Sequence, residues 1–397
     1  MLNLYKEKAQ CCGCGICSFV CPQHAISMQA DAMGFVYPVI NQTLCIDCGA
    51  CAKNCSYGKE IIPDTLACYA GMNTNDAQLQ HSASGGIFSA IASEFLQDGL
   101  LCGATMTLDN GIAIVRHEFG SDIRKFQGSK YVQSDLLPCL DAIGNALRSG
   151  KKVLFCGTPC QVHAVRSLFR NHLDRLFAID IICHGVPNQQ FFNDYLSLYQ
   201  KENKFQLVHF DFRNKQYGWG LKGKATDSYG KHHVITPENC SYYKYFLEGE
   251  IYRDSCYNCP YACMQRPGDL TIGDYWGIEK YNSELLAKNG GEFSAKKGVS
   301  CLLVNNSRGE ELLRKYGRHI LTAPVDIQNI LIINTQLREP AQHSPKRSKI
   351  FNAYQQNGYA GVQRIFRREM GIKKVRKLVK CITPLPIRNA IKNMRKT

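Results

Sequence analysis

Two cysteine motifs with the same spacing constrain the N-terminal part of this chain more than any other feature. The first is Cys11, Cys14, Cys17 and Cys21 followed by Pro22, and the second is Cys45, Cys48, Cys51 and Cys55 followed by Ser56. In C-x2-C-x2-C-x3-C, three closely spaced thiolates surround one iron–sulfur cube, and the fourth cysteine binds the other cube. The repeat therefore predicts a two-cluster 4Fe-4S ferredoxin domain of α+β type over residues 1–58.

This pairing rule assigns the ligands of each cluster. Cluster one takes Cys11, Cys14, Cys17 and Cys55, and cluster two takes Cys45, Cys48, Cys51 and Cys21. The alternative is a pair of zinc sites, but those commonly use two separated C-x2-C pairs. Cys12 is an extra thiol beside a ligand, and we expect it to be a bystander.

The whole chain holds 21 cysteines in 397 residues, which raises the question of disulfides. The chain opens with MLNLYKEKAQ and no apolar signal segment, and its cysteine count is odd. Thiolates in a reducing, cytoplasmic compartment fit these facts better. The longest apolar stretch, residues 85–106, is interrupted by Glu94 and Asp98, so we expect no membrane-spanning helix.

The basic charge of the chain is concentrated at its C-terminal end. The net charge is +15, and residues 346–397 alone contain 15 Lys and Arg against the single acid Glu369. Between Val362 and Ile382, apolar residues recur at three- and four-residue steps among the cations, which predicts an amphipathic helix ended by Pro384 and Pro386. This basic tail, residues 341–397, is expected to touch the inner face of the cell membrane, or else to pack its apolar stripe on the body. Nucleic-acid binding is not expected, because the tail has few aromatic residues.

Residues 67–340 have the pattern of an α/β domain. The strand 153–156 turns at Gly157-Thr158-Pro159 into a helix, and the strand 177–183 turns at His184-Gly185 into a helix beginning near Asn188. Successive βα units imply parallel strands, so both turns should open at the carboxyl edge of one sheet, where such proteins bind ligands. Residues 205–240 alternate like antiparallel strands, so the sheet structure is expected to be mixed and only partly parallel.

A flavin site is the next expectation. Iron–sulfur cubes move single electrons, so a two-electron substrate requires a converter, which side chains cannot provide and a flavin can. Ser84, Gly85 and Gly86 precede a helical run from Ile87, and such a turn lets backbone N–H groups approach a phosphate. The alternative is an ordinary helix cap. A G-x-G-x-x-G match at Gly218–Gly223 is rejected as a dinucleotide site, because no helix follows it.

Four further cysteines suggest a third cluster. Cys160 and Cys183 belong to the two sheet-edge turns, and Cys256 and Cys259 form a C-x2-C loop. Together they supply four thiolates for a third 4Fe-4S cluster. The alternative is a set of buried free cysteines, and Cys263 is a rival for the fourth ligand.

Five segments in order carry a resemblance to a known family. They are GSKYVQSDL (128–136), KKVLFCGTPCQ (151–161), CHGVP (183–187), CYNC (256–259) and GDLTIGDYWGIEK (268–280). Over residues 66–315, and most densely over 81–280, the chain resembles the family of coenzyme F-420 hydrogenase/dehydrogenase beta subunits, behind a fused ferredoxin domain.

The resemblance implies an FAD-binding α/β domain that exchanges electrons with a two-electron partner. It places flavin-site motifs on Ser84, Gly85, Gly86, Lys130, Tyr131, Thr158, Pro159 and Asp274, and motif cysteines on Cys160, Cys183, Cys256 and Cys259. Cys156 and Cys263 fall outside the pattern and are treated as bystanders. Bacterial relatives with this layout often accompany extracellular-polysaccharide genes.

Two residues are expected to take part in the chemistry. Lys130 would stabilise the anionic reduced flavin, unless it is a plain surface lysine. His184 would relay a proton, although satisfying a turn carbonyl is the favoured alternative.

The sequence therefore predicts an iron–sulfur flavoprotein oxidoreductase. Its expected partners are a redox protein such as a ferredoxin and a small two-electron substrate. The alternative is a non-catalytic subunit that delivers electrons to a separate catalytic chain.

Overall fold

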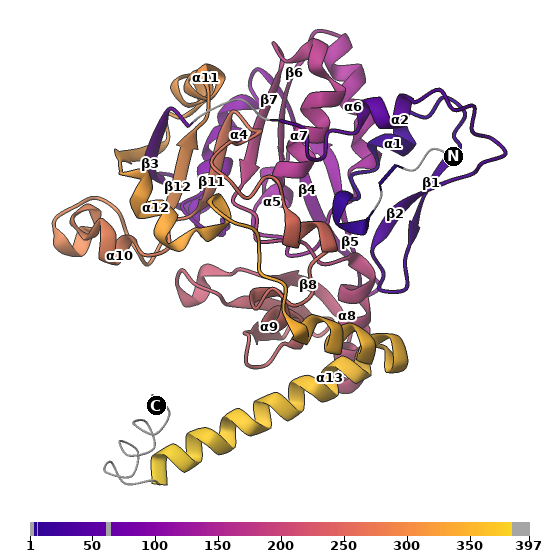
Figure 1. Cartoon of the computed structure of the whole chain (residues 1–397). Helices are drawn as coiled ribbons and strands as arrows, with labels where there is room; N and C mark the ends of the chain where they lie inside the picture. Colours follow the sequence, from indigo (N-terminus) through magenta and orange to yellow (C-terminus); the bar gives the residue numbers. More distant parts are fainter. Residues whose placement is uncertain (1–3, 6, 61–64, 383–397) are drawn as a thin grey trace, which may run out of the picture.

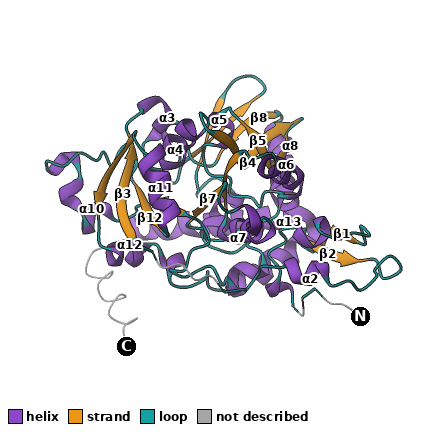
Figure 2. Cartoon of the chain, turned by 90° about the horizontal axis from the view of Figure 1, so that it is seen from above, coloured by secondary structure: helices purple, strands orange, loops and turns teal. Residues whose placement is uncertain are grey.

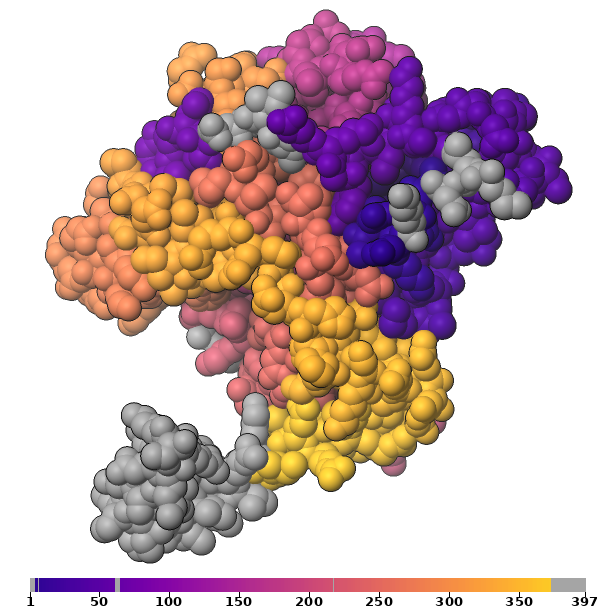
Figure 3. Space-filling view, viewed as in Figure 1, coloured from indigo at the N-terminus to yellow at the C-terminus, as the bar shows by residue number. Residues whose placement is uncertain are grey.

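The computed structural model describes residues 4–5, 7–60 and 65–382. A small N-terminal domain lies against a body built on an eight-stranded sheet, and a long C-terminal helix starts on the body and projects from it (Figure 1). Seen from above, the N-terminal domain lies at the opposite end of the molecule from β3 (Ala67–Asn73) and β12 (Ser300–Val304) (Figure 2). In the space-filling view, the indigo N-terminal residues abut the body (Figure 3).

The N-terminal domain consists of two short helices and one hairpin. Its elements are α1 (Ile16–Phe19), β1 (Ile26–Ala30), β2 (Val36–Ile40) and α2 (Ala50–Asn54). β1 and β2 pair antiparallel, and each helix starts after a left-handed glycine, Gly15 (φ 79°) or Gly49 (φ 69°). Because glycine adopts this conformation without strain, the chain can turn sharply inside each cysteine motif. The α+β fold expected for this domain is confirmed.

The body contains a mixed sheet of eight strands. In spatial order the strands are β13 (Ile320–Pro324), β3, β12, β11 (Leu270–Asp274), β7 (Leu176–Ile181), β6 (Lys152–Gly157), β4 (Gly99–Asp109) and β5 (Ile112–Gly120). The four central strands β4, β6, β7 and β11 are parallel, and the flanking pairs are antiparallel. The mixed, partly parallel sheet is therefore confirmed, and both βα turns end at one carboxyl edge, as expected.

Helices cover both faces of the central strands. Along β6, Val153 and Phe155 pack with α6 and α7, whereas Leu154 packs on the opposite side with α4 and α11. This alternation follows from the two-residue period of a strand, and it buries the strand on both faces. The body helices are α3 (Asp76–Gln80), α4 (Ile87–Phe95), α5 (Ile123–Phe126), α6 (Leu137–Arg148), α7 (Pro159–Leu168), α8 (Gln189–Asn203), α9 (Ser241–Leu247), α10 (Ile278–Tyr281), α11 (Ser307–Tyr316) and α12 (Ile327–Ile333).

A second, three-stranded sheet lies beside α8 and α9 and adds an aromatic core. It is antiparallel, in the order β10 (His232–Ile235), β9 (Gly223–Asp227) and β8 (Leu207–Asp211). The G-x-G-x-x-G match at residues 218–223 leads directly into β9, so its rejection as a dinucleotide site is confirmed. The aromatic core joins distant parts of the chain, since Phe35 and Tyr37 of the N-terminal domain pack in it together with Phe191 and Tyr242.

The C-terminal helix α13 (Pro345–Ile382) is part of the body over its first half. Non-helical angles at Asn357 and Gly358 divide it, and Val362 and Phe366 are buried in the aromatic core. The first part of the apolar stripe therefore packs on the body. For these residues the structure supports packing and not membrane contact. Pro384 and Pro386 lie outside the described residues. Within the described ranges, no helix has the length and apolarity needed to cross a membrane.

Candidate functional site

A cavity of about 450 Å³ lies at the carboxyl edge of the parallel strands. The ends of three neighbouring strands contribute Gly157 of β6, Ile181 of β7 and Asp274 of β11 to its wall. Its volume falls within the ~300–1,000 Å³ typical of small-molecule and cofactor pockets. The position is also the one at which open α/β sheets bind ligands.

The turn before α4 forms one wall of the cavity. Ser84 and Gly86 line it, and Gly86 precedes the helix in left-handed conformation (φ 74°) with no side chain capping the helix. Gly85 lies behind the wall, where an added Cβ would meet the Gly71 carbonyl oxygen at 2.2 Å. Because the first N–H groups of a helix lack intrahelical partners, this wall is suited to an anionic group. The plain-cap alternative is not supported by a capping side chain.

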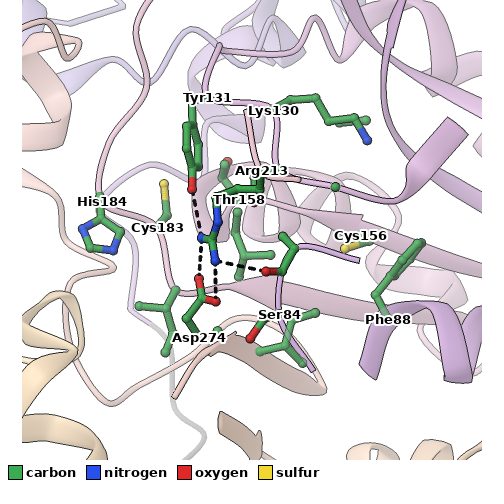
Figure 4. Close-up of a pocket in the computed structure, with 18 of the residues that line it drawn as sticks. Ser84, Phe88, Lys130, Tyr131, Cys156, Thr158, Cys183, His184, Arg213 and Asp274 are labelled. Atoms are coloured by element: carbon green, nitrogen blue, oxygen red, sulfur yellow. Dashed lines mark hydrogen bonds and ion pairs between the residues drawn. The ribbon is translucent and has the colours of Figure 1, made fainter. Parts of the chain in front are cut away.

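A buried ion pair crosses the cavity from Arg213 to Asp274 (Figure 4). Arg213 Nη1 donates to Asp274 Oδ2 at 3.0 Å, and Nη2 donates to Oδ1 at 3.1 Å and to the Ala83 carbonyl at 3.0 Å. Nη1 also donates to the Tyr131 hydroxyl at 3.2 Å, and Trp219 Nε1 donates to Asp274 Oδ1 at 2.8 Å. Arg213 is only 7% exposed, and its Nε has no hydrogen-bond partner among the described residues. Arg213 therefore keeps one buried donor without a partner among the described residues.

Thr158 and Pro159 shape the turn between β6 and α7. Thr158 lines the cavity and caps α7 through a capping box with Gln161, and its Oγ1 lies 3.2 Å from Cys160 Sγ. Pro159 is buried at the first position of α7 and is not part of the cavity wall. Both residues thus help to position Cys160 at the cavity, but only Thr158 contributes to the cavity wall.

Lys130 and His184 both line the cavity, with different surroundings. Lys130 Nζ donates to the carbonyls of Lys125, Phe126 and Gln127 at 3.2, 2.9 and 2.8 Å, which uses all three ammonium donors. Burial lowers the pKa of Lys130 to about 8. Lys130 is thus neither a free surface lysine nor a free hydrogen-bond donor, and only its charge can reach into the cavity.

The His184 imidazole has no hydrogen-bond partner among the described residues. It therefore satisfies no turn carbonyl, which was the favoured alternative for this residue. Burial lowers its pKa, and the Asp274 carboxylate acts in the opposite direction. A neutral imidazole facing the cavity can accept or release a proton.

The structure brings the eight N-terminal thiols together in two sets. Cys11 and Cys17 interact electrostatically with Cys14 and Cys55, whereas Cys21, Cys45, Cys48 and Cys51 line one small hollow. These are the two ligand sets that the spacing predicts. No three His, Cys, Asp or Glu side chains of the described residues converge on a single metal ion.

A third set of thiols lies between the N-terminal domain and the cavity. Cys160, Cys183, Cys256 and Cys259 interact electrostatically with one another, and Cys160 and Cys183 also line the cavity. Cys12 is buried, and its thiol interacts with those of both Cys14 and Cys160, so it links the first cysteine motif to this third set instead of standing apart.

The two remaining bystander cysteines lie outside the third set. Cys263 Sγ points to the carbonyls of Pro260 and Gln265, each at 3.4 Å. Cys156 lines the cavity but does not interact with the four thiols of the third set.

Comparisons with known proteins match two family descriptions. Residues 150–326 match the C-terminal part of the beta subunits of coenzyme F-420 hydrogenase/dehydrogenase, and residues 10–59 match the 4Fe-4S dicluster domain. The chain carries both of these family domains. The first match covers Cys160, Cys183, Cys256, Cys259 and Asp274, and the second covers the eight N-terminal cysteines.

Relatives span most of the chain at low identity. An uncharacterized protein of Methanocaldococcus jannaschii is 21% identical over 77% of this chain and 86% of its own length. A subunit of the F(420)H(2) dehydrogenase of Methanosarcina mazei is 20% identical over 71% and 80%. A chloroplastic 7-hydroxymethyl chlorophyll a reductase of Oryza sativa is 26% identical over 47% and 36%. A solved chain from the F-420-reducing nickel–iron hydrogenase complex of Methanosarcina barkeri has a TM-score of 0.45 and 17% identity, covering 69% and 90%.

Several residues around the cavity were missed by sequence reasoning. Arg213 follows β8, and Lys215 Nζ donates to the Leu79 and Ser84 carbonyls, so the two cations hold the turn before α4. Trp219 and Trp276 stack at 4.6 Å with 3° between their rings. Trp219 lies within the glycine motif that was rejected as a dinucleotide site. A tryptophan in this glycine-rich turn was the one sequence feature that could have pointed to the cavity.

Proposed function

We propose that this protein is an iron–sulfur flavoprotein oxidoreductase. Electrons would pass between a redox partner protein and the two N-terminal clusters, through a third cluster on Cys160, Cys183, Cys256 and Cys259, to FAD in the cavity. The observation that carries the proposal is that Cys160 and Cys183 belong to the third thiol set and also line the cavity. A cluster bound by these cysteines would therefore lie directly beside the ligand in the cavity.

The position, volume and charge of the cavity support flavin binding. Ser84, Gly85 and Gly86 would place the α4 N-terminus at a phosphate, and the Arg213 guanidinium, which lines the cavity, would add positive charge beside it. Tyr131, Thr158 and Asp274 would complete the surroundings, with Pro159 supporting the Thr158 turn from behind the wall and Asp274 acting through Arg213. When bound, a flavin accepts electrons singly and delivers them in pairs.

The chain's own residues would manage charge and protons. The Lys130 ammonium, held by three carbonyls, would place a positive charge beside an anionic ring. His184 would hold or release the proton that accompanies electron transfer to a small substrate, because its ring has no competing hydrogen bond among the described residues.

Anaerobic purification tests the cofactor content. The expected result is one non-covalent FAD and twelve irons per chain, with the double variant Cys160→Ser and Cys183→Ser falling to eight irons. Cys263→Ser is the matched control, since its thiol points away from the set, and should keep twelve. Unchanged iron in the double variant rules out the third cluster, and full clusters without FAD under any expression condition rule out the flavin site.

A second function is favoured by one relative. The Methanosarcina mazei protein is named as one subunit of a dehydrogenase, which supports an electron-transfer role for this chain beside a separate catalytic chain. Reoxidation of the reduced single chain by a small two-electron acceptor would favour the enzyme, and dependence on a copurifying protein would favour the electron-transfer role. The link to polysaccharide synthesis stays a prediction of the family resemblance.

A further inference from the structure

Arg253 is a buried guanidinium at the junction of the N-terminal domain and the body. It is 1% exposed, and all three of its nitrogen atoms donate hydrogen bonds. Nε donates to Gln133 Oε1 at 3.0 Å, Nη1 to the Cys11 carbonyl at 3.2 Å, and Nη2 to the Val36 carbonyl at 2.7 Å. Its guanidinium carbon lies 4.5 Å from the centre of the Tyr37 ring. The side chain is thus fixed against the first cysteine motif.

The same residue is tied to the third thiol set through the backbone. Arg253 N donates to the Val186 carbonyl at 3.0 Å, three residues after Cys183, and Cys256 N donates to the Arg253 carbonyl at 2.9 Å. The guanidinium acts electrostatically on Cys11, Cys160 and Cys256. Arg253 is therefore hydrogen-bonded to the first cysteine motif through its side chain and to the third thiol set through its main chain.

No carboxylate among the described residues forms an ion pair with Arg253. The adjacent Asp254 pairs with Arg347 instead, at 2.8 Å. Taking a charge out of water without a counter-charge is costly, and neutral carbonyls and aromatic rings compensate it only in part. A buried unpaired guanidinium therefore indicates an anion nearby, and a 4Fe-4S cube held by four thiolates carries net negative charge.

The Arg253 guanidinium packs closely on the first cysteine motif at Gly13. Gly13 lies between Cys12 and Cys14 with φ 67°, and an added Cβ would come within 2.5 Å of Arg253 Nη2. The loop thus has a glycine where the guanidinium passes.

We propose that Arg253 is the counter-cation shared by cluster one and the third thiol set, and that its charge raises their reduction potentials. Each cluster becomes more negative by one charge when it accepts one electron from the redox partner, so a fixed neighbouring cation favours the reduced form. The inference rests on the iron–sulfur part of the proposed function and not on FAD.

The test is a redox titration monitored by electron paramagnetic resonance on anaerobically purified full-length protein. Arg253→Gln should shift the potentials of cluster one and the third cluster to more negative values and leave cluster two, bound by Cys45, much less changed. Arg253→Lys keeps the charge and should restore the potentials. Arg308→Gln is the matched control, because Arg308 also stacks on a ring, Phe177, but shows no interaction with any cysteine among the described residues.

Each outcome decides the proposal. Wild-type potentials in Arg253→Gln overturn it. If that variant binds less iron, Arg253→Lys decides: full iron with near-wild-type potentials supports the charge, and a loss equal to that of the glutamine variant overturns it in favour of packing alone. Because these measurements follow the clusters, they stand even if the protein proves to lack FAD.

Discussion

At the scale of single residues, the Asp274 carboxylate joins two parts of the cavity wall. It accepts two hydrogen bonds from Arg213 and one from Trp219, at the end of β11. Arg213 also holds the Ala83 carbonyl. Asp274 thereby connects the strand edge to the turn before α4, where we place a flavin phosphate.

Replacing Asp274 with Asn should destabilise the protein and empty the flavin site. The Arg213 charge would stay buried without its partner, which costs about 3–5 kcal/mol. Urea unfolding measures the loss, and flavin per chain should fall while iron stays constant. Asp98→Asn is the control, since Asp98 is partly exposed beside Lys152 and Lys315, and its loss should destabilise the protein much less than the loss of Asp274. Full flavin content in Asp274→Asn would contradict the site.

At the scale of elements, α13 has two parts with different roles. Its first part buries Val362 and Phe366, and Arg367 pairs with Glu202 of α8. Beyond Ile372, which is exposed, the helix continues with the basic sequence KKVRKLVK. We therefore expect membrane contact at the C-terminal end of this helix and not at the buried Val362 and Phe366.

Two truncations separate packing from membrane binding. A chain ending at Gly371 should keep the stability of the full chain but no longer pellet with anionic vesicles, because about 1 kcal/mol of binding is lost with each removed cation. A chain ending at Thr335 should be strongly destabilised, since it removes Ile350, Phe351 and Val362 from the core. Co-sedimentation and urea unfolding give the two readouts. Equal pelleting of the Gly371 chain and the full chain would show that these residues are not the anchor.

The elements with a local signal were predicted well. Around Gly157 and Pro159, the apolar strand pattern, the turn residues and the helix cap all lie close together in the sequence. The observed bounds of β6 and α7 are therefore close to the predicted ones. The aromatic core has no such signal, because its members run from Phe35 to Phe366 and meet only in the folded chain. For the same reason, the first part of α13 was assigned to a separate tail.

At the scale of the whole molecule, the buried neutral His117 makes the free energy of unfolding depend on pH. His117 is 1% exposed and stacks on Phe155, and burial lowers its pKa to about 4. Between pH 6.5 and 4 the unfolded chain binds this proton and the folded chain does not, so stability falls as the pH drops through that window. We expect a loss of about 1 kcal/mol at pH ~5.5 relative to pH ~7.5 from this residue alone.

Urea unfolding of the wild type and His117→Gln at the two pH values measures this contribution. The variant should be less stable at both values but should lose about 1 kcal/mol less between them. An identical pH dependence in the two proteins would show that His117 is not the group responsible.

The candidate site was predictable only where its residues are close in sequence. The eight N-terminal cysteines lie in two short motifs, so their spacing was enough to assign two sets. Arg213 and Arg253 were missed because each acts on residues more than a hundred positions away. Such contacts depend on the order of the strands in the sheet, and that order cannot be predicted from a single sequence.

The third thiol set also has a consequence for biogenesis. Its four cysteines span residues 160–259, whereas the eight N-terminal cysteines are complete at Cys55. At translation rates of about 5–20 residues per second, roughly 10–40 seconds separate the emergence of Cys55 from that of Cys259. We expect iron loading in two stages, because all eight N-terminal cysteines are synthesised before Cys259, and a cluster on the third set would need β7 and its neighbours to be folded.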